Sequence, residues 1–315
     1  MKLGFQLLHA GPLATVPNMV EMARLAERLG YDSIVVTDHV VIPRRIESRY
    51  PYNATGRALI APDADYFEPL SLLCYLAGLT TRIRLGTSVL VLPYRNPVLT
   101  AKALATLDLL SGGRLFVGIG AGWLAEEFHA LAAPPFADRG RVTDEWIEIL
   151  LKLWTEDRPT FEGRFYRFEE IACFPRPAQK PHPPLFVGGN SRPAIRRAAK
   201  YGQSWHAFRL PAADLRPLLA DLRDQLRIHG RPPDACGLSV RYGIRVVGPR
   251  GDAARRPGEE PGRVFVGAAA RVAEQLQPLL DLGPTDVILD CRTGSFAEVL
   301  ETMERLATEV WPKLE

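Results

Sequence analysis

The chain has 315 residues, of which 47% are hydrophobic and 24% are charged, and its formal net charge is +3. This composition suits a globular protein with a large core and excludes a disordered or fibrous chain. Acidic and basic residues are interspersed, so no basic stripe or tail indicates a nucleic-acid partner or an anionic membrane surface.

The four cysteines, Cys74, Cys173, Cys236 and Cys291, lie far apart and form no CxxC pair. They indicate free thiols in a reducing cytosol rather than a disulfide framework or a zinc site. The uncharged stretch 3–20 contains polar residues and prolines, which argues against a signal peptide and a membrane span. We therefore expect a cytoplasmic protein with no metal site.

The chain alternates between strand and helix patterns from its beginning. Residues 2–8 form an apolar strand pattern, and a helical spacing of apolar residues follows until Gly30. The alternation then predicts strands at 33–37, 82–92 and 114–118, and helices at 68–79, 96–110 and 142–154. The second half predicts strands at 184–187, 204–208, 238–247 and 285–291, and helices near 191–202, 211–229, 269–282 and 296–311.

Eight strands, each followed by a helix, predict an α/β fold of the (β/α)₈ TIM-barrel type, formed by residues 1–315 as a single domain. Such a barrel typically has about 250 residues. Two irregular stretches, 38–67 and 155–183, account for most of the surplus. Because both are taken to follow barrel strands, we expect two insertions at the C-terminal face, over the rim of the active site.

A dinucleotide-binding Rossmann domain is the main alternative fold, because Gly118, Gly120 and Gly122 follow a predicted strand. The full GxGxxG motif needs a third glycine at position 123, where Trp123 stands. The alternative is therefore disfavoured.

Functional residues of a TIM barrel lie at the C-terminal ends of its strands. One predicted strand ends at Asp38 and His39, where an imidazole could give or take a proton. Another ends at Gly188-Gly189-Asn190-Ser191, just before a helix. Glycines allow close approach and a helix N-terminus favours an anion, so this turn could hold a phosphate; an ordinary strand-to-helix turn fits the same residues.

Five blocks in the same order closely resemble the luciferase-like monooxygenase family. They are residues 30–39, 81–88, 105–114, 118–123 and 188–191. Within that family the chain looks most like the branch that uses the deazaflavin coenzyme F420. The resemblance implies a flavin-type ring at the barrel mouth, a small organic substrate and a homodimer.

The resemblance also assigns roles to residues. It implies that His39 is catalytic, moving a proton as the hydride moves, with Asp38 beside it. Thr87, Ser88 and Val89 match a bulge, often with a non-prolyl cis peptide, that supports the ring. Gly120 and the segment Gly188, Gly189, Asn190 and Ser191 complete the implied cofactor-binding set, the segment matching a phosphate-holding loop.

One departure from the family pattern narrows the range of substrates that we expect. Sugar-phosphate dehydrogenases of the family carry a glutamate where this chain has Ala121, which cannot transfer a proton, so we do not expect a sugar phosphate. Three functions stay open. They are hydride transfer with F420, a two-component monooxygenase using FMN and a separate reductase, and flavin binding without turnover.

Overall fold

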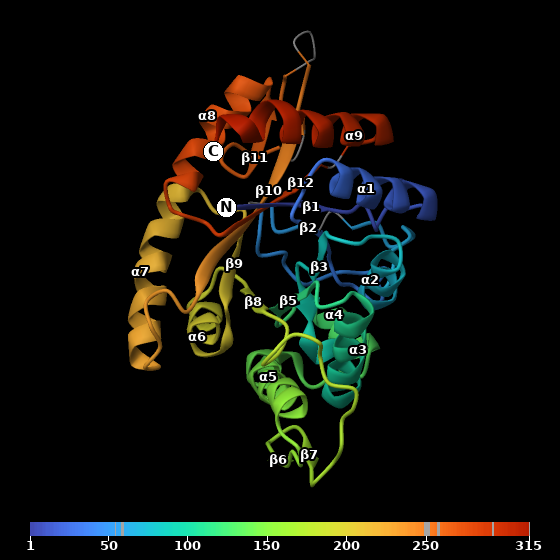
Figure 1. Ribbon diagram of the computed structural model, residues 1–315, viewed down its shortest axis with the longest axis vertical. Helices are drawn as coiled ribbons and strands as arrows, with labels where there is room; N and C mark the ends of the chain where they lie inside the picture. Colours follow the sequence, from blue (N-terminus) through green and yellow to red (C-terminus); the bar gives the residue numbers. More distant parts are fainter. Residues whose placement is uncertain (54, 58–59, 249–252, 257–258, 292, 315) are drawn as a thin grey trace.

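The computed structural model describes residues 1–53, 55–57, 60–248, 253–256, 259–291 and 293–314. Eight parallel strands close into a barrel, in the order β1-β2-β3-β5-β8-β9-β10-β12, with β12 paired to β1 (Figure 1). These strands are β1 (Lys2–Gln6), β2 (Ser33–Val36), β3 (Arg84–Thr87), β5 (Leu115–Gly120), β8 (Leu185–Gly188), β9 (Ser204–Phe208), β10 (Gly237–Val246) and β12 (Asp286–Asp290). The predicted TIM barrel is confirmed.

Helices surround the barrel (Figure 1). They are α1 (Val16–Arg28), α2 (Pro69–Ala77), α3 (Pro97–Leu110), α4 (Ala125–Ala130), α5 (Arg139–Thr155), α6 (Arg192–Tyr201), α7 (Ala212–Ile228), α8 (Ala269–Leu280) and α9 (Phe296–Arg305). Local chemistry fixes several helix starts. The Asn96 side chain accepts hydrogen bonds from the first free N–H groups of α3, and Pro97 takes the first helical position. No helix in the described ranges is both long and apolar enough to cross a membrane.

Three local elements differ from the predicted pattern. The single strand expected over 82–92 is divided, because the Ser88–Val89 peptide is cis and separates β3 from β4 (Leu90–Val91). An extra strand, β11 (Val264–Gly267), pairs in parallel with the second half of β10. Helix α4 lies where no helix was expected, since its six residues are too few to show a helical period.

The first insertion, 38–67, begins at the C-terminal end of β2, as expected. Its far end is tied to the loop after β1 by an antiparallel bridge between Ala10 and Tyr66 and by the Phe67 N–H, which donates to the carbonyl of His9. Since both anchors follow barrel strands, this insertion lies at the barrel mouth.

The second insertion, 155–183, lies elsewhere. It follows α5 rather than a strand, so it starts at the opposite end of the barrel. It carries a small hairpin of β6 (Phe161–Glu162) and β7 (Arg167–Phe168), which Figure 1 shows beside α5. Its Tyr166 packs edge-on against Trp146 of α5, and Gln179 bonds Asp108 of α3. The expectation that it covers the mouth is corrected: it packs along the outside of α3 and α5.

Side chains alternate between two cores along each strand. Ile34 and Val36 belong to the main core between barrel and helices, whereas Val35 packs in a separate cluster with Phe116, Phe186 and Ile288. This second cluster fills the middle of the ring. Towards the C-terminal strand ends the barrel also buries polar side chains, among them Gln6, His206 and Asp290.

Candidate active site at the mouth of the barrel

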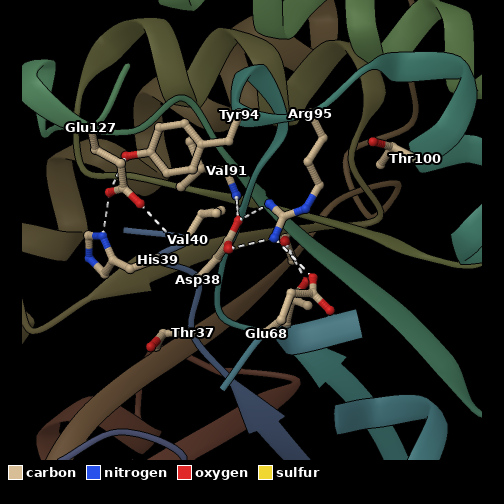
Figure 2. A network of polar contacts seen from close by, with 12 residues as sticks. Thr37, Asp38, His39, Val40, Glu68, Val91, Tyr94, Arg95, Thr100 and Glu127 are labelled. Atoms are coloured by element: carbon tan, nitrogen blue, oxygen red, sulfur yellow. Dashed lines mark hydrogen bonds and ion pairs between the residues drawn. The ribbon is translucent and has the colours of Figure 1, made fainter. Parts of the chain in front are cut away.

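His39 and Glu127 form a short contact at the C-terminal end of β2. Nδ1 of His39 lies 2.6 Å from Oε2 of Glu127, and both side chains are buried (Figure 2). An ionised carboxylate only accepts hydrogen bonds, so Nδ1 carries the proton that it donates to Glu127. In the neutral imidazole this leaves Nε2 as an acceptor, and no described residue bonds that nitrogen.

Glu127 is held by more than His39. Its Oε1 accepts from the backbone N–H groups of Val40 and Val41, at 2.7 and 3.2 Å, and its Oε2 also accepts from the hydroxyl of Tyr94 at 2.8 Å. Burial and the adjacent carboxylate raise the pKa of Tyr94 well above its usual value, so the phenol stays protonated. Sequence reasoning missed Glu127. Its only sequence signal is an acidic residue soon after the Gly-Trp block.

Asp38 faces away from His39 and binds other parts of the chain. Both of its oxygens accept from the Arg95 guanidinium, at 2.6 and 2.9 Å, and one also accepts from the Val91 N–H at 2.8 Å (Figure 2). Arg95 in turn donates to Glu68. Burial raises the pKa of Asp38, and the Arg95 charge partly offsets this effect. Both oxygens of Asp38, which was predicted to contact a cofactor, bond protein groups that fix β4 beside His39.

Ser88 and Val89 form the expected bulge between β3 and β4. Val89 packs over two glycines: a Cβ added to Gly120 would lie 2.5 Å from one Val89 methyl, and one added to Gly188 would lie 2.6 Å from the other. Thr87 bonds the carbonyl of Gly118, where an added Cβ would strike the Thr87 carbonyl. The structure therefore brings these predicted residues together, with the glycines making room for Val89.

The bulge rests on a polar network that the sequence did not reveal. Ser88 Oγ bonds Nε2 of His206, and Nδ1 of His206 bonds Ser239 Oγ, both at 2.8 Å. Nη1 of Arg241 donates to the Ser88 carbonyl at 2.8 Å. Burial and the nearby Arg241 charge lower the pKa of His206 to about 3, so this ring stays neutral at physiological pH.

The turn after β8 is hydrogen-bonded to the end of β9. Gly189 has φ +121°, a conformation that L side chains rarely adopt. Asn190 exchanges two hydrogen bonds with the backbone of Phe208, at 2.8 and 3.1 Å. Ser191 precedes α6 without using its side chain as a cap. The first N–H groups of α6 therefore keep the capacity to bind an anion.

Aromatic rings cross the mouth from β2 to β9. In order, edge-to-face contacts of 5.0 to 6.1 Å link His39, Trp123, Tyr50, Tyr52 and Phe208. The strands β2 and β9 lie on opposite sides of the ring. At the end of β1, Oε1 of Gln6 is buried with no hydrogen-bond partner among the described residues. Ring faces, a glycine-lined bulge and an unpaired buried acceptor suit a flat ligand with polar edges.

The chain is similar to known proteins in both sequence and fold. The model of the luciferase-like monooxygenase family matches residues 3–284. An F420-dependent glucose-6-phosphate dehydrogenase from Segniliparus rotundus is 34% identical over 190 residues, 59% of this chain and 51% of that protein. An FMNH₂-dependent dimethylsulfone monooxygenase from Pseudomonas putida is 37% identical over 141 residues, 44% of this chain and 38% of that protein.

Among solved structures, an F420-dependent secondary alcohol dehydrogenase in complex with an F420–acetone adduct superimposes with a TM-score of 0.80 at 18% identity, covering 100% of this chain and 99% of that one. This likeness concerns the fold. The matched part of the chain spans 38% to 62% of the length of these two curated relatives and of a third one, from Mycobacterium bovis.

Proposed function

Because the chain belongs to the luciferase-like monooxygenase family, we propose that it is an oxidoreductase that transfers a hydride between coenzyme F420 and a small organic substrate at the barrel mouth. The observation that carries the proposal is the His39–Glu127 contact, which fixes Nδ1 as a donor and leaves Nε2 for a reacting group. The relative that aligns over 190 residues uses F420, as its name states.

The residues present fit such a coenzyme. Val89, seated on Gly120 and Gly188, would support one face of the ring, and Thr87 and Ser88 hold Val89 in place. The turn Gly188 to Ser191, with the N-terminus of α6, would hold the phosphate-bearing arm. When bound, the deazaflavin would supply or accept the hydride.

His39 would manage the proton that accompanies the hydride. Nε2 takes a proton from the substrate hydroxyl when the substrate is oxidised and returns it in the reverse direction. Glu127 keeps the ring in one tautomer and stabilises the imidazolium while it exists, since both groups are buried. Asp38 acts indirectly, by fixing β4. The aromatic row would exclude water from the reacting atoms.

The test is a titration of the protein with F420, followed by the fluorescence of the coenzyme, with FMN titrated in parallel. We expect F420 to bind at micromolar concentration or below. Tight binding of FMN with no binding of F420 would overturn this assignment. Loss of turnover in His39→Ala with retained F420 binding would support the role of His39.

A monooxygenase using reduced FMN is the second candidate, favoured by the Pseudomonas putida relative. It would need a separate reductase. Oxygen uptake in the presence of a reductase and FMN separates it from the first candidate. If the wild-type protein binds a flavin-type ring but shows no turnover with F420 or FMN, so that His39→Ala changes no measured activity, the chain is instead a flavin-binding protein without turnover.

The proposal also covers the oligomeric state and the location of the protein. We expect a cytoplasmic homodimer, as in the family branch that the sequence resembles. Light scattering on the purified protein checks the mass, which for one chain is 34.9 kDa.

A further inference from the structure

The first insertion packs its far end against the residue near its start. His39 lies near the beginning of this insertion and Tyr66 near its end, just before α2. The Tyr66 ring lies edge-to-face with the imidazole of His39, with ring centres 5.4 Å apart and an angle of 82° between the planes. Trp123 makes a second edge-to-face contact with this imidazole, at 6.1 Å. The insertion therefore supplies one of the two aromatic rings that the described residues place against His39.

The Tyr66 hydroxyl is anchored to the end of the strand that carries His39. It is hydrogen-bonded to Oγ1 of Thr37, two residues before His39. The N–H of Thr37 in turn donates to Nε2 of His9 at 3.0 Å. Because that nitrogen accepts, Nδ1 of His9 carries the proton, which it donates to the carbonyl of Leu7 at 3.0 Å. The His9 ring also packs edge-on against Tyr66, at 5.1 Å. Tyr66 is thus held through both its ring and its hydroxyl.

The backbone on both sides of Tyr66 is hydrogen-bonded to the loop after β1. The N–H of Gly11 donates to the carbonyl of Asp65 at 2.9 Å. On the other side, the N–H of Phe67 donates to the carbonyl of His9 at 3.0 Å. Because both neighbours are fixed, the side chain of Tyr66 has a defined place beside His39.

The imidazole of His39 needs such a lateral contact. Among the described residues it has one hydrogen-bond partner, Glu127, which lies 2.6 Å from Nδ1. One hydrogen bond fixes the position of Nδ1 but not the plane of the ring, since the χ2 torsion of histidine is broad. Edge-to-face packing against Tyr66 restricts rotation about that torsion and so sets the direction in which Nε2 points. Proton transfer depends on this direction, because a small misplacement of a reacting group lowers the rate.

We propose that Tyr66 is a positioning residue for His39, which holds the imidazole in the plane that turns Nε2 towards the reacting atoms. The inference rests on the proposed function and deepens it, since it concerns the proton carrier of that reaction. It assigns the far end of the first insertion a role at the reacting centre, through His39 rather than through contact with the coenzyme.

Two variants of Tyr66 separate the ring from the hydroxyl. Tyr66→Leu removes the ring, and Tyr66→Phe removes only the hydroxyl. Tyr166→Leu is the matched control. Tyr166 is also half-buried, lies edge-to-face with Trp146 at 5.8 Å and 80°, and accepts a hydrogen bond from Asn96 at 3.0 Å, but it belongs to the second insertion. Should Tyr66→Leu not fold, Tyr66→Met takes its place, because the longer methionine side chain fills irregular gaps.

The measured quantity is the rate at which the Nδ1 proton of His39 exchanges with water. It is followed by NMR on protein with isotope-labelled histidine and without coenzyme, and the His39 signals are those missing in His39→Gln. We expect Tyr66→Leu to speed this exchange by about three- to tenfold, the equivalent of one aromatic pair. Tyr66→Phe should stay close to the wild-type rate, and Tyr166→Leu should exchange as wild type.

Three results would overturn the proposal. One is the wild-type exchange rate in Tyr66→Leu. Another is an equal rise in Tyr166→Leu, which would indicate a general loosening of the fold. The third is an equal rise in Tyr66→Phe, which would assign the effect to the hydroxyl instead of the ring.

A titration with F420 separates this proposal from the proposed function. Tyr66→Leu should bind F420 as the wild type does, because Tyr66 acts through His39. A clear loss of F420 affinity in Tyr66→Leu would show that Tyr66 contacts the coenzyme, and would contradict a positioning role. If the wild type binds no F420, the proposed function fails, and the exchange rates still decide whether Tyr66 holds His39.

Discussion

Glu127 holds the side chain of His39 and also the backbone that directly follows it, at Val40 and Val41. One carboxylate holds His39 Nδ1, two backbone N–H groups and the Tyr94 hydroxyl. Replacing it by glutamine offers His39 an amide donor, which favours the tautomer with the proton on Nε2 and blocks acceptance there.

Glu127→Gln should therefore lower kcat by about a hundredfold while the affinity for the coenzyme stays within about threefold of wild type. Stopped-flow turnover and a coenzyme titration measure the two quantities. Tyr94→Phe is the control, because it removes another partner of Glu127 and leaves the contact with His39; we expect little loss. Equal losses in the two variants would show that Glu127 has only a structural role.

The lowered pKa of His206 predicts how the stability of the folded protein depends on pH. Its pKa in the folded protein is about 3, below the ordinary value of 6.5, so the unfolded chain binds the extra proton first. Stability from this residue is present above about pH 6.5 and is lost as the pH falls towards 3.

Urea unfolding between pH 6 and pH 4 should show that His206→Gln removes up to about 1.4 kcal/mol per pH unit of the decline in stability, the slope for one proton. His229→Gln, on the exposed end of α7, should keep the wild-type slope. An unchanged slope in His206→Gln would mean that this imidazole is not held neutral.

The bulge between β3 and β4 has room for the Val89 side chain because glycines, Gly120 and Gly188, lie against it. Gly120→Ala should displace Val89 and lower both stability and coenzyme affinity, because its Cβ would lie 2.5 Å from a Val89 methyl. The double variant Gly120→Ala, Val89→Ala should recover most of the stability. Thermal unfolding checks this, with Gly78→Ala as the neutral control, since its Cβ meets only ordinary contacts. Additive losses in the double variant would contradict the pairing of Gly120 with Val89.

Helix α4 clamps the first insertion through two consecutive acids. Next to Glu127, Glu126 accepts from the N–H groups of Glu47 and Ser48, at 2.6 and 2.8 Å. Burial alone would raise the pKa of Glu126, but these bonds and the Ser48 hydroxyl lower it to about 2. A lowered carboxyl pKa gives stability that is present above about pH 4.5 and is lost as the pH falls through 2.

Hydrogen exchange at the amides of Glu47 and Ser48 should remain protected down to pH 3 in the wild type. Glu126→Gln should lower this protection already at neutral pH, since a neutral amide is a weaker acceptor. Loss of protection near pH 4.5 in the wild type, or wild-type protection in the variant, would contradict the clamp.

At the scale of the whole molecule, periodicity predicted the closed barrel, because eight strand and helix patterns recur along the chain. The insertion 155–183 was wrongly expected at the mouth, although the predicted helix 142–154 runs directly into it and a helix of this fold ends at the opposite face of the barrel. Short elements such as α4 and β11 escaped for lack of length. His39 and the β3 bulge could be found by resemblance, and His206 lies near the end of a predicted strand, whereas Glu127, on a helix that was not predicted, is brought to His39 only by tertiary contacts.

The central claim is that the mouth holds a redox ring between the bulge at Val89 and the imidazole of His39. The most direct measurement is a crystal structure of the protein with bound F420. We expect the ring at the C-terminal ends of the strands, with Val89 on one face, Nε2 of His39 within hydrogen-bonding reach of the reacting atoms and the phosphate arm at Gly188 to Ser191. A ring bound outside the barrel mouth, or a His39 side chain turned away from it, would contradict the account.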